Sequence, residues 1–308
     1  MKPLLPERTA RGPLACWLLR SGGYQAWVAE QGAQVLEYGR AGGPPVLWLS
    51  PQAQYLPGVS VRGGVPVCWP WFNDLARTNP EAVRQSWPRQ AGEGAAPAHG
   101  FARGLPWHVL GSGADPQACW LHLRLPRTQG PDWPQAVEPE VRIRLSADGR
   151  LRIALRNHNA GAHSVTIGQA LHTYFAVGDV RRASVSGLDG KTYLDTVGAW
   201  QQRVQHGPVR FEGEVDRIYQ DVPAELAIDD PVLGRRVHLR AEGSRSAIVW
   251  NPHVEKARRL SQFPDEAWTG MLCVETANVM QDALALAPGQ AHELAVSLWE
   301  TPAGHLRD

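Results

Sequence analysis

Short stretches in which apolar and polar residues alternate recur along the chain, and this pattern predicts β-strands. The clearest pair lies at 141–145 and 151–155, where every second residue is Val, Ile or Leu. The sequence Ala-Asp-Gly at 147–149 has the composition of a tight turn, so these two segments are expected to form a hairpin. The segments 120–125 and 292–299 are predicted to be strands for the same reason.

Apolar runs predict further strands that are buried on both faces of a sheet. Three short runs occupy 46–49, 247–250 and 271–274. A longer run at 165–177 is expected to form one long β segment. Because apolar runs and alternating segments follow one another along the chain, an all-β protein is predicted.

Helices are expected to be few and short. The polar stretch 74–97 is predicted to be a surface loop with one short helix near 80–85, and a helical turn is expected within 255–263. The 31 Gly and 25 Pro residues interrupt the chain too often for long helices. Since there is no internal repeat and no linker, residues 1–308 are predicted to form one domain, a large antiparallel β-sandwich with its core at about 20–300.

Composition narrows the choice of partners and compartment. With 43% hydrophobic residues, 20% charged residues and a net charge of +1, the chain has the composition of a soluble globular protein and gives no reason to expect nucleic acid or a membrane surface as a partner. No apolar segment at the N-terminus is long enough for a signal peptide or a membrane span, so a cytoplasmic location is expected.

Motifs for metals, redox chemistry and nucleotides are missing from the sequence. It contains no CxxC pair, no zinc-type Cys/His spacing, no GxGxxG and no P-loop, so we expect neither a metal nor a nucleotide cofactor. The four scattered cysteines favour a reducing compartment; they are Cys16, Cys68, Cys119 and Cys273.

Several polar residues stand beside apolar segments, and each has a structural as well as a functional interpretation. Glu275 follows the run 271–274, where a carboxylate is costly to bury unless it is used, although it could simply face water at a strand end. His172 lies among apolar and aromatic neighbours and could be a core histidine held by a backbone carbonyl. Trp69 and Trp71 could wall a pocket or fill the core, and composition favours the core.

Six motifs in register carry a resemblance to a known family. From about residue 20 to the end, the chain closely resembles the D-hexose-6-phosphate mutarotases, also called glucose-6-phosphate 1-epimerases, of the galactose-mutarotase-like superfamily. The motifs are, in chain order, VRGGVPVCWPWF at 61–72, HGFAR at 99–103, ALHTYF at 170–175, VDRIY at 215–219, VWNP at 249–252 and CVETANV at 273–279.

The resemblance implies a galactose mutarotase-like β-supersandwich and a role for each matching residue. A Gln usually precedes the HGFAR-type motif as a substrate contact, but this chain has Ala98 there, which puts its preference among hexoses in question. The implied roles are catalysis for His172 and Glu275, phosphate binding for Arg62 and Arg103, substrate binding for Asp216, and a place in the pocket for His99.

These residue types suit mutarotation, in which a pyranose ring opens and recloses with the other configuration at C1. One group takes a proton from the C1 hydroxyl and another donates a proton to the ring oxygen. Glu275 fits the base and His172 the acid, and the nearby carboxylate would help His172 to hold its proton. The planar guanidinium groups of Arg62 and Arg103 match phosphate oxygens. The reaction needs no metal, nucleotide or covalent intermediate.

We therefore predict a glucose-6-phosphate 1-epimerase that acts on a hexose 6-phosphate as a monomer. Two alternatives stay open. One is an aldose 1-epimerase that acts on unphosphorylated sugars, for which the arginine pair would have no role. The other is a non-catalytic sugar-phosphate-binding module, which would not need an acid–base pair. Trp69, Trp71 and Phe101 could supply an apolar wall for the sugar or serve a purely structural role.

Overall fold

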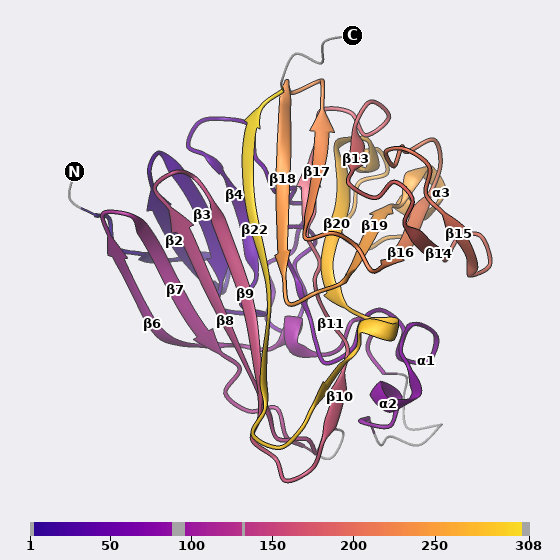
Figure 1. The fold of residues 1–308 in the computed structure, drawn as a ribbon. Coiled ribbons are helices and arrows are strands. Elements are labelled where there is room, and N and C mark those ends of the chain that lie inside the picture. Colours follow the sequence, from indigo (N-terminus) through magenta and orange to yellow (C-terminus); the bar gives the residue numbers. More distant parts are fainter. Residues whose placement is uncertain (1–2, 88–95, 131–132, 304–308) are drawn as a thin grey trace.

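Antiparallel β-sheets make up most of the molecule, as the alternating pattern predicts (Figure 1). The computed structural model describes residues 3–87, 96–130 and 133–303. Within these residues, every pairing between named strands is antiparallel. The predicted hairpin is confirmed: 141–145 and 151–155 lie in β8 and β9, which pair across the turn at 147–149.

One eight-stranded sheet forms the first layer of a sandwich. Its spatial order is β13–β17–β18–β22–β9–β8–β7–β6. The strands are β6 (His108–Asp115), β7 (Ala118–Arg124), β8 (Val137–Ser146), β9 (Leu151–Asn159), β13 (Ser184–Ser186), β17 (Glu225–Asp230), β18 (Arg235–Glu242) and β22 (Ala291–Pro302).

A second eight-stranded sheet has the order β15–β14–β16–β19–β20–β11–β5, and β12 also pairs with β20. Its central strand, β20, is buried at every position because strands flank it and the first layer covers one face. The strands are β5 (Val67–Cys68), β11 (Gln169–Leu171), β12 (Tyr174–Ala176), β14 (Thr192–Asp195), β15 (Gln201–Val204), β16 (Val215–Gln220), β19 (Ser246–Asn251) and β20 (Met271–Asn278).

Two smaller sheets complete the sandwich. One is the meander β1 (Glu7–Arg11), β2 (Leu14–Ser21), β3 (Tyr24–Ala29) and β4 (Val35–Arg40); the other pairs β10 (Val165–Ile167) with β21 (Leu284–Leu286). Strands β2 and β3 pack on β7 and β8, while β20 packs on β22, so the meander and the second large sheet together oppose the first sheet. A large apolar cluster fills the space between these layers.

Helices are short, as predicted. They are α1 (Leu75–Thr78), α2 (Glu81–Arg84), α3 (His253–Ala257), η1 (Ala102–Gly104), η2 (Ala267–Gly270) and η3 (Met280–Asp282). The helix predicted near 80–85 is α2, and the turn predicted within 255–263 overlaps α3. Residues 88–95 of the predicted loop 74–97 lie outside the described residues.

The prediction of one long β segment over 165–177 is wrong, because the chain changes partners twice. Strand β10 pairs with β21, whereas β11 pairs with β5 and β20, and β12 returns to β20 further along. Gly168 lies at the first break, and His172 and Thr173 lie at the second. The run 46–49 is also not a regular strand, since it forms only isolated bridges.

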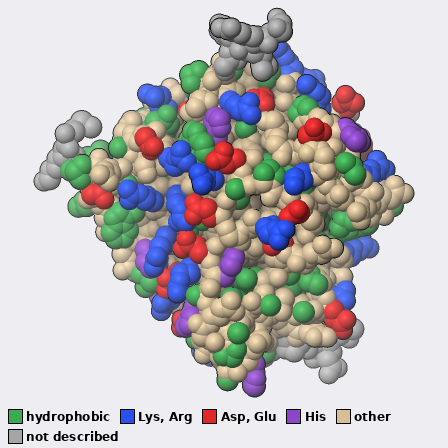
Figure 2. All heavy atoms as spheres, viewed as in Figure 1, with side chains coloured by type: hydrophobic (Ala, Val, Ile, Leu, Met, Phe, Trp, Pro, Cys, Tyr) green, Lys and Arg blue, Asp and Glu red, His purple; other side chains and the backbone are tan. Residues whose placement is uncertain are grey.

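Charges of both signs are interspersed on the face of the molecule that carries β6–β9, β18 and β22 (Figure 2). Several of them pair across strands, for example Arg152 of β9 with Glu293 of the neighbouring β22 and with Glu242 of β18, one strand further along. This mixture agrees with the small net charge. Among the described residues, no helix is long and apolar enough to cross a membrane.

Candidate active site

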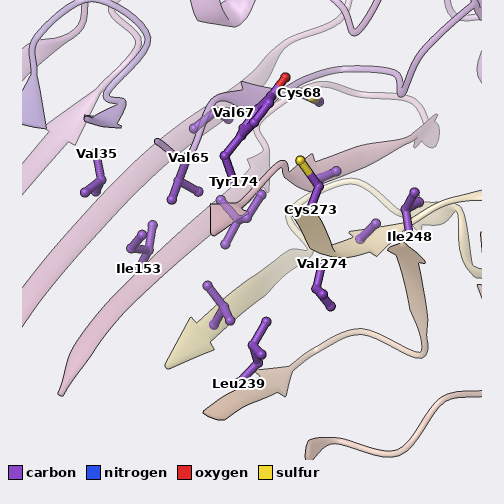
Figure 3. Packing of buried hydrophobic residues seen from close by; sticks show 14 of the residues in the cluster. Val35, Val65, Val67, Cys68, Ile153, Tyr174, Leu239, Ile248, Cys273 and Val274 are labelled. Carbon is purple, nitrogen blue, oxygen red and sulfur yellow. The ribbon is translucent and has the colours of Figure 1, made fainter. Parts of the chain in front are cut away.

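Glu275 lies inside the central strand β20 and not at its end. Cys273 and Val274 point to opposite sides of this strand, with Val274 directed toward Leu239 (Figure 3). Because side chains alternate along a strand, Glu275 shares the side of Cys273, which faces away from the opposing sheet. Glu275 is 2% exposed, so the interpretation as a strand-end carboxylate facing water is wrong.

His172 lies at the break between β11 and β12, where its backbone N–H donates to the Pro66 carbonyl over 3.0 Å. The ring stacks on Tyr174, with centroids 4.7 Å apart and planes 10° apart. Its Nε2 lies 3.5 Å from Oε1 of Glu275, and its buried Nδ1 has no hydrogen-bond partner. The side-chain polar group that the ring approaches through Nε2 is therefore the Glu275 carboxylate.

Burial acts on His172 and Glu275 in opposite senses. It raises the pKa of Glu275 well above its ordinary value, and the negative charge of Asp216 adds to this. It lowers the pKa of His172 to about 3, and the positive charges of Arg103 and Arg62 add to that effect. Burial thus favours the uncharged form of both groups in the free protein, a neutral imidazole and a protonated carboxyl.

Arg62 is delivered by a tight turn that its neighbouring glycines make possible. Gly63 and Gly64 have positive φ angles of 112° and 63°. A Cβ at either position would collide with the backbone of an adjacent segment, at Trp48–Leu49 for Gly63 and at Val35–Leu36 for Gly64. The guanidinium donates through Nη1 to the Tyr174 hydroxyl and through Nε to the Ser261 carbonyl, both over 3.3 Å. These contacts fix Arg62 beside the ring that stacks on the imidazole.

The segment from His99 to Arg103 forms another wall of the site. Nδ1 of His99 accepts the backbone N–H of Asn73 over 3.2 Å, so in the neutral ring the proton resides on Nε2. The His99 ring lies edge-on to His172 with centroids 5.3 Å apart, and burial holds its pKa well below the ordinary value. Arg103 donates through Nη2 to the Ala98 carbonyl over 2.8 Å.

Asp216 lies on β16, opposite Trp250 of β19. Burial raises the pKa of Asp216, whereas the ammonium of Lys256, with Nζ 3.9 Å from Oδ2, acts in the opposite direction. The same ammonium lies 3.1 Å from Oε1 of Glu214. Lys256 therefore stabilises the ionised form of a carboxylate that the protein otherwise desolvates.

All six residues singled out in the sequence line one cavity of about 240 Å³. Sequence reasoning gave no role to Tyr174 or Lys256, which also line it, although Tyr174 stands two positions after His172 in the same motif. The full lining is Arg62, Phe72, Asn73, Ala98, His99, Arg103, His172, Tyr174, Asp216, Ile248, Trp250, Lys256, Leu260 and Glu275.

The aromatic wall differs from the one expected. Trp69 and Trp71 are fully buried in the core and Phe101 packs on both, so none of the three lines the cavity. Trp250 and Tyr174 supply the aromatic surface instead. Within the described residues, no three His, Cys, Asp or Glu side chains gather in a way that could hold a metal ion.

Comparison with known proteins identifies the family of the chain that carries this cavity. The family model described as aldose 1-epimerase matches residues 15–299. The chain belongs to the aldose 1-epimerase family. A protein of Escherichia coli named "putative glucose-6-phosphate 1-epimerase" is 32% identical over 271 residues, which span 87% of this chain and 84% of that protein. The protein described here is thus an epimerase, an enzyme of the isomerase class.

Solved structures agree on the architecture of this epimerase. The crystal structure of a "putative mutarotase" from Salmonella typhimurium superposes with a TM-score of 0.84 at 27% identity, over 97% of this chain and 94% of the other. A galactose mutarotase-like protein from Clostridium acetobutylicum has a TM-score of 0.75 at 14% identity, over 98% and 100% of the two chains, and shows the shared fold. The predicted β-supersandwich is confirmed.

Proposed function

We propose that this epimerase interconverts the α and β anomers of glucose 6-phosphate or a closely related hexose 6-phosphate. One observation carries the proposal: His172 and Glu275, 3.5 Å apart, line the same cavity as the guanidinium groups of Arg62 and Arg103. The name of the Escherichia coli relative supports the same substrate. A free sugar would leave two cations in the cavity without an anionic partner.

The proton pair suits ring opening and closure at C1. In the proposed reaction the carboxylate of Glu275 accepts the proton of the C1 hydroxyl while the imidazolium of His172 donates to the ring oxygen. After the C1 carbonyl rotates, the two groups exchange roles and the ring closes as the other anomer. Ring opening moves one proton off His172 and one proton onto Glu275, and ring closure reverses both transfers. Each group therefore returns to its starting protonation state after a full cycle.

The remaining cavity residues position the sugar phosphate. Arg62 and Arg103 present planar donor forks that suit the oxygens of a phosphate. His99, whose Nε2–H is free to donate when the ring is neutral, and Asp216, whose carboxylate accepts, both line the cavity and suit sugar hydroxyls. Ala98 lines the cavity without a polar side chain, so one sugar hydroxyl is left without the contact that a Gln would give.

Exchange between anomers gives the direct test. NMR exchange spectroscopy at C1, or polarimetry from pure α anomer, would compare glucose 6-phosphate with glucose as substrates of the purified protein. We expect acceleration over buffer for the phosphorylated sugar and a much smaller effect for glucose. Equal efficiency would favour the aldose 1-epimerase alternative, and tight binding of glucose 6-phosphate without exchange would favour the binding module.

We also propose that residues 1–308 form a single domain. The large apolar cluster supports this, because it includes residues from all four sheets, for example Leu19, Ile153, Ile167 and Val274. A cooperative unfolding transition that coincides for fluorescence and circular dichroism would agree with one unit.

A further inference from the structure

The candidate acid, His172, is physically connected to the candidate phosphate site. Nη1 of Arg62 donates to the hydroxyl of Tyr174, and the Tyr174 ring lies flat on the His172 imidazole at 4.7 Å. On another side, Arg103 belongs to the same short segment as His99, whose ring meets His172 at 5.3 Å. Arg62 is thus linked to the imidazole through the Tyr174 ring, and the second guanidinium, that of Arg103, lines the same cavity.

Charged and titratable groups surround His172 from every element packed on it. Positive and negative groups act on different partners. The charges of Arg62 and Arg103 disfavour protonation of the imidazole, whereas the charge of Asp216 disfavours ionisation of Glu275. These groups are Arg62 before β5, Cys68 on β5, His99 and Arg103 around η1, Tyr174 on β12, Asp216 on β16, Lys256 on α3, and Cys273 and Glu275 on β20.

These charges favour protonation states of His172 and Glu275 that differ from those required by the proposed reaction. In the protein without substrate, burial and the charges of Arg62, Arg103 and Asp216 favour a neutral His172 and a protonated Glu275, whereas ring opening as proposed requires imidazolium and carboxylate. Both forms contain the same single proton, so they differ only in its position between Nε2 and Oε1. The charges of the surrounding groups decide which of the two atoms holds the proton, because low-dielectric surroundings strengthen electrostatic interactions.

We propose that the phosphate group of the substrate switches this pair into its working form. The two negative charges of a bound phosphate dianion offset the guanidinium charges of Arg62 and Arg103, and the proton then passes from Oε1 of Glu275 to Nε2 of His172. No proton is taken from solvent and none is released. The phosphate thus contributes to the rate of ring opening as well as to binding. This inference rests on the proposed function.

Nitrogen-15 NMR of labelled histidine tests the proton position directly. The probes are 1,5-anhydroglucitol 6-phosphate, which lacks the C1 hydroxyl and cannot open its ring, and the same compound without phosphate. At saturation near pH 7 we expect His172 to be imidazolium with the first ligand and neutral with the second. A neutral His172 with both ligands would overturn the proposal. The His172→Asn variant assigns the signal.

A matched pair of variants tests the part played by the arginine. In Arg62→Gln one opposing charge is gone, so the unliganded His172 signal should already move toward imidazolium at pH 7. Arg182 is an exposed arginine outside the cavity, and Arg182→Gln should leave the signal unchanged. An identical His172 signal in Arg62→Gln and Arg182→Gln would contradict the electrostatic coupling.

Kinetics provide a second measurement that does not depend on NMR assignment. Phosphite dianion added in solution should occupy the arginine site and accelerate anomerisation of unphosphorylated glucose by roughly 10-fold or more, since general acid–base catalysis contributes about 10²–10⁴ in rate. Tyr174→Phe keeps the stacked ring but removes the hydroxyl that Arg62 contacts, and should reduce the ratio of the glucose rate with phosphite to the glucose rate without it. Wild-type protein that converts glucose 6-phosphate but shows no activation would overturn the switch; failure to convert glucose 6-phosphate would instead remove the proposed function.

Discussion

Single replacements of His172 and Glu275 should give opposite dependences of stability on pH. The pKa of His172 falls from 6.5 to about 3 on folding, so between these values the unfolded state binds more protons and stability rises with pH. The pKa of Glu275 rises well above 4.5, so above that value the folded state binds more protons and stability falls with pH. Between pH 4.5 and 6.5 the two contributions therefore oppose each other in the wild type.

Replacement of one residue leaves only the other residue's contribution to the pH dependence of stability: that of His172 in Glu275→Gln, and that of Glu275 in His172→Asn. A proton difference of one corresponds to about 1.4 kcal/mol per pH unit. Relative to wild type, the unfolding free energy of Glu275→Gln should therefore rise by roughly 2–3 kcal/mol from pH 4.5 to 6.5, and that of His172→Asn should fall over the same interval.

Urea unfolding at pH 4.5, 5.5 and 6.5, followed by tryptophan fluorescence, measures these differences. Subtraction of the wild-type curve removes the contributions of other titrating groups. The variant His163→Asn changes an exposed histidine and should show no slope against wild type. Slopes of the same sign for both site variants, or no slope for either, would refute the assignment of a neutral imidazole beside a protonated carboxyl.

Four further predictions concern activity. Glu275→Gln should lower the anomerisation rate by roughly 10²–10⁴-fold with an unchanged circular dichroism spectrum; full activity would rule out Glu275 as the base. Arg103→Gln should lower kcat/KM for glucose 6-phosphate by about 10- to 100-fold, as expected for a lost charge-assisted hydrogen bond of about 1.5–3 kcal/mol, with a much smaller effect on glucose. Lys256→Met should raise the pKa of Asp216 and move the acid limb of the kcat/KM profile to higher pH; an unmoved limb would exclude this coupling. Ala98→Gln should change the ratio of rates on glucose, galactose and mannose 6-phosphates, and a constant ratio would show that this position does not select the sugar.

The sequence was sufficient for many of the strands and for six residues of the cavity. Alternation placed β8 and β9 correctly, because the pattern of a half-buried strand is local. The motifs brought Arg62, His172 and Glu275 to attention, and the structure places all three in one cavity. Their catalytic and binding roles stay a prediction.

Two features could not be read from the sequence, because they depend on contacts between distant segments. The break at His172 arises where β11 and β12 leave and rejoin β20, and an apolar run gives no sign of it. The protonation states of His172 and Glu275 depend on burial and on Arg62, Arg103 and Asp216, which come from other parts of the chain. The aromatic wall was misjudged for a similar reason: a run of Trp and Phe does not show which rings face inward.

Glu275 sits on a strand that is hydrogen-bonded to neighbours on both sides, whereas Arg62 and Ala98 lie in loops and Arg103 lies in the short helix η1. A change in the position of the carboxylate would require several strands to move together, but a turn can exchange a side chain at small structural cost. Divergence of this fold toward new sugars should therefore conserve the proton chemistry and alter the turns, so redesign of selectivity is best begun with libraries confined to those loops.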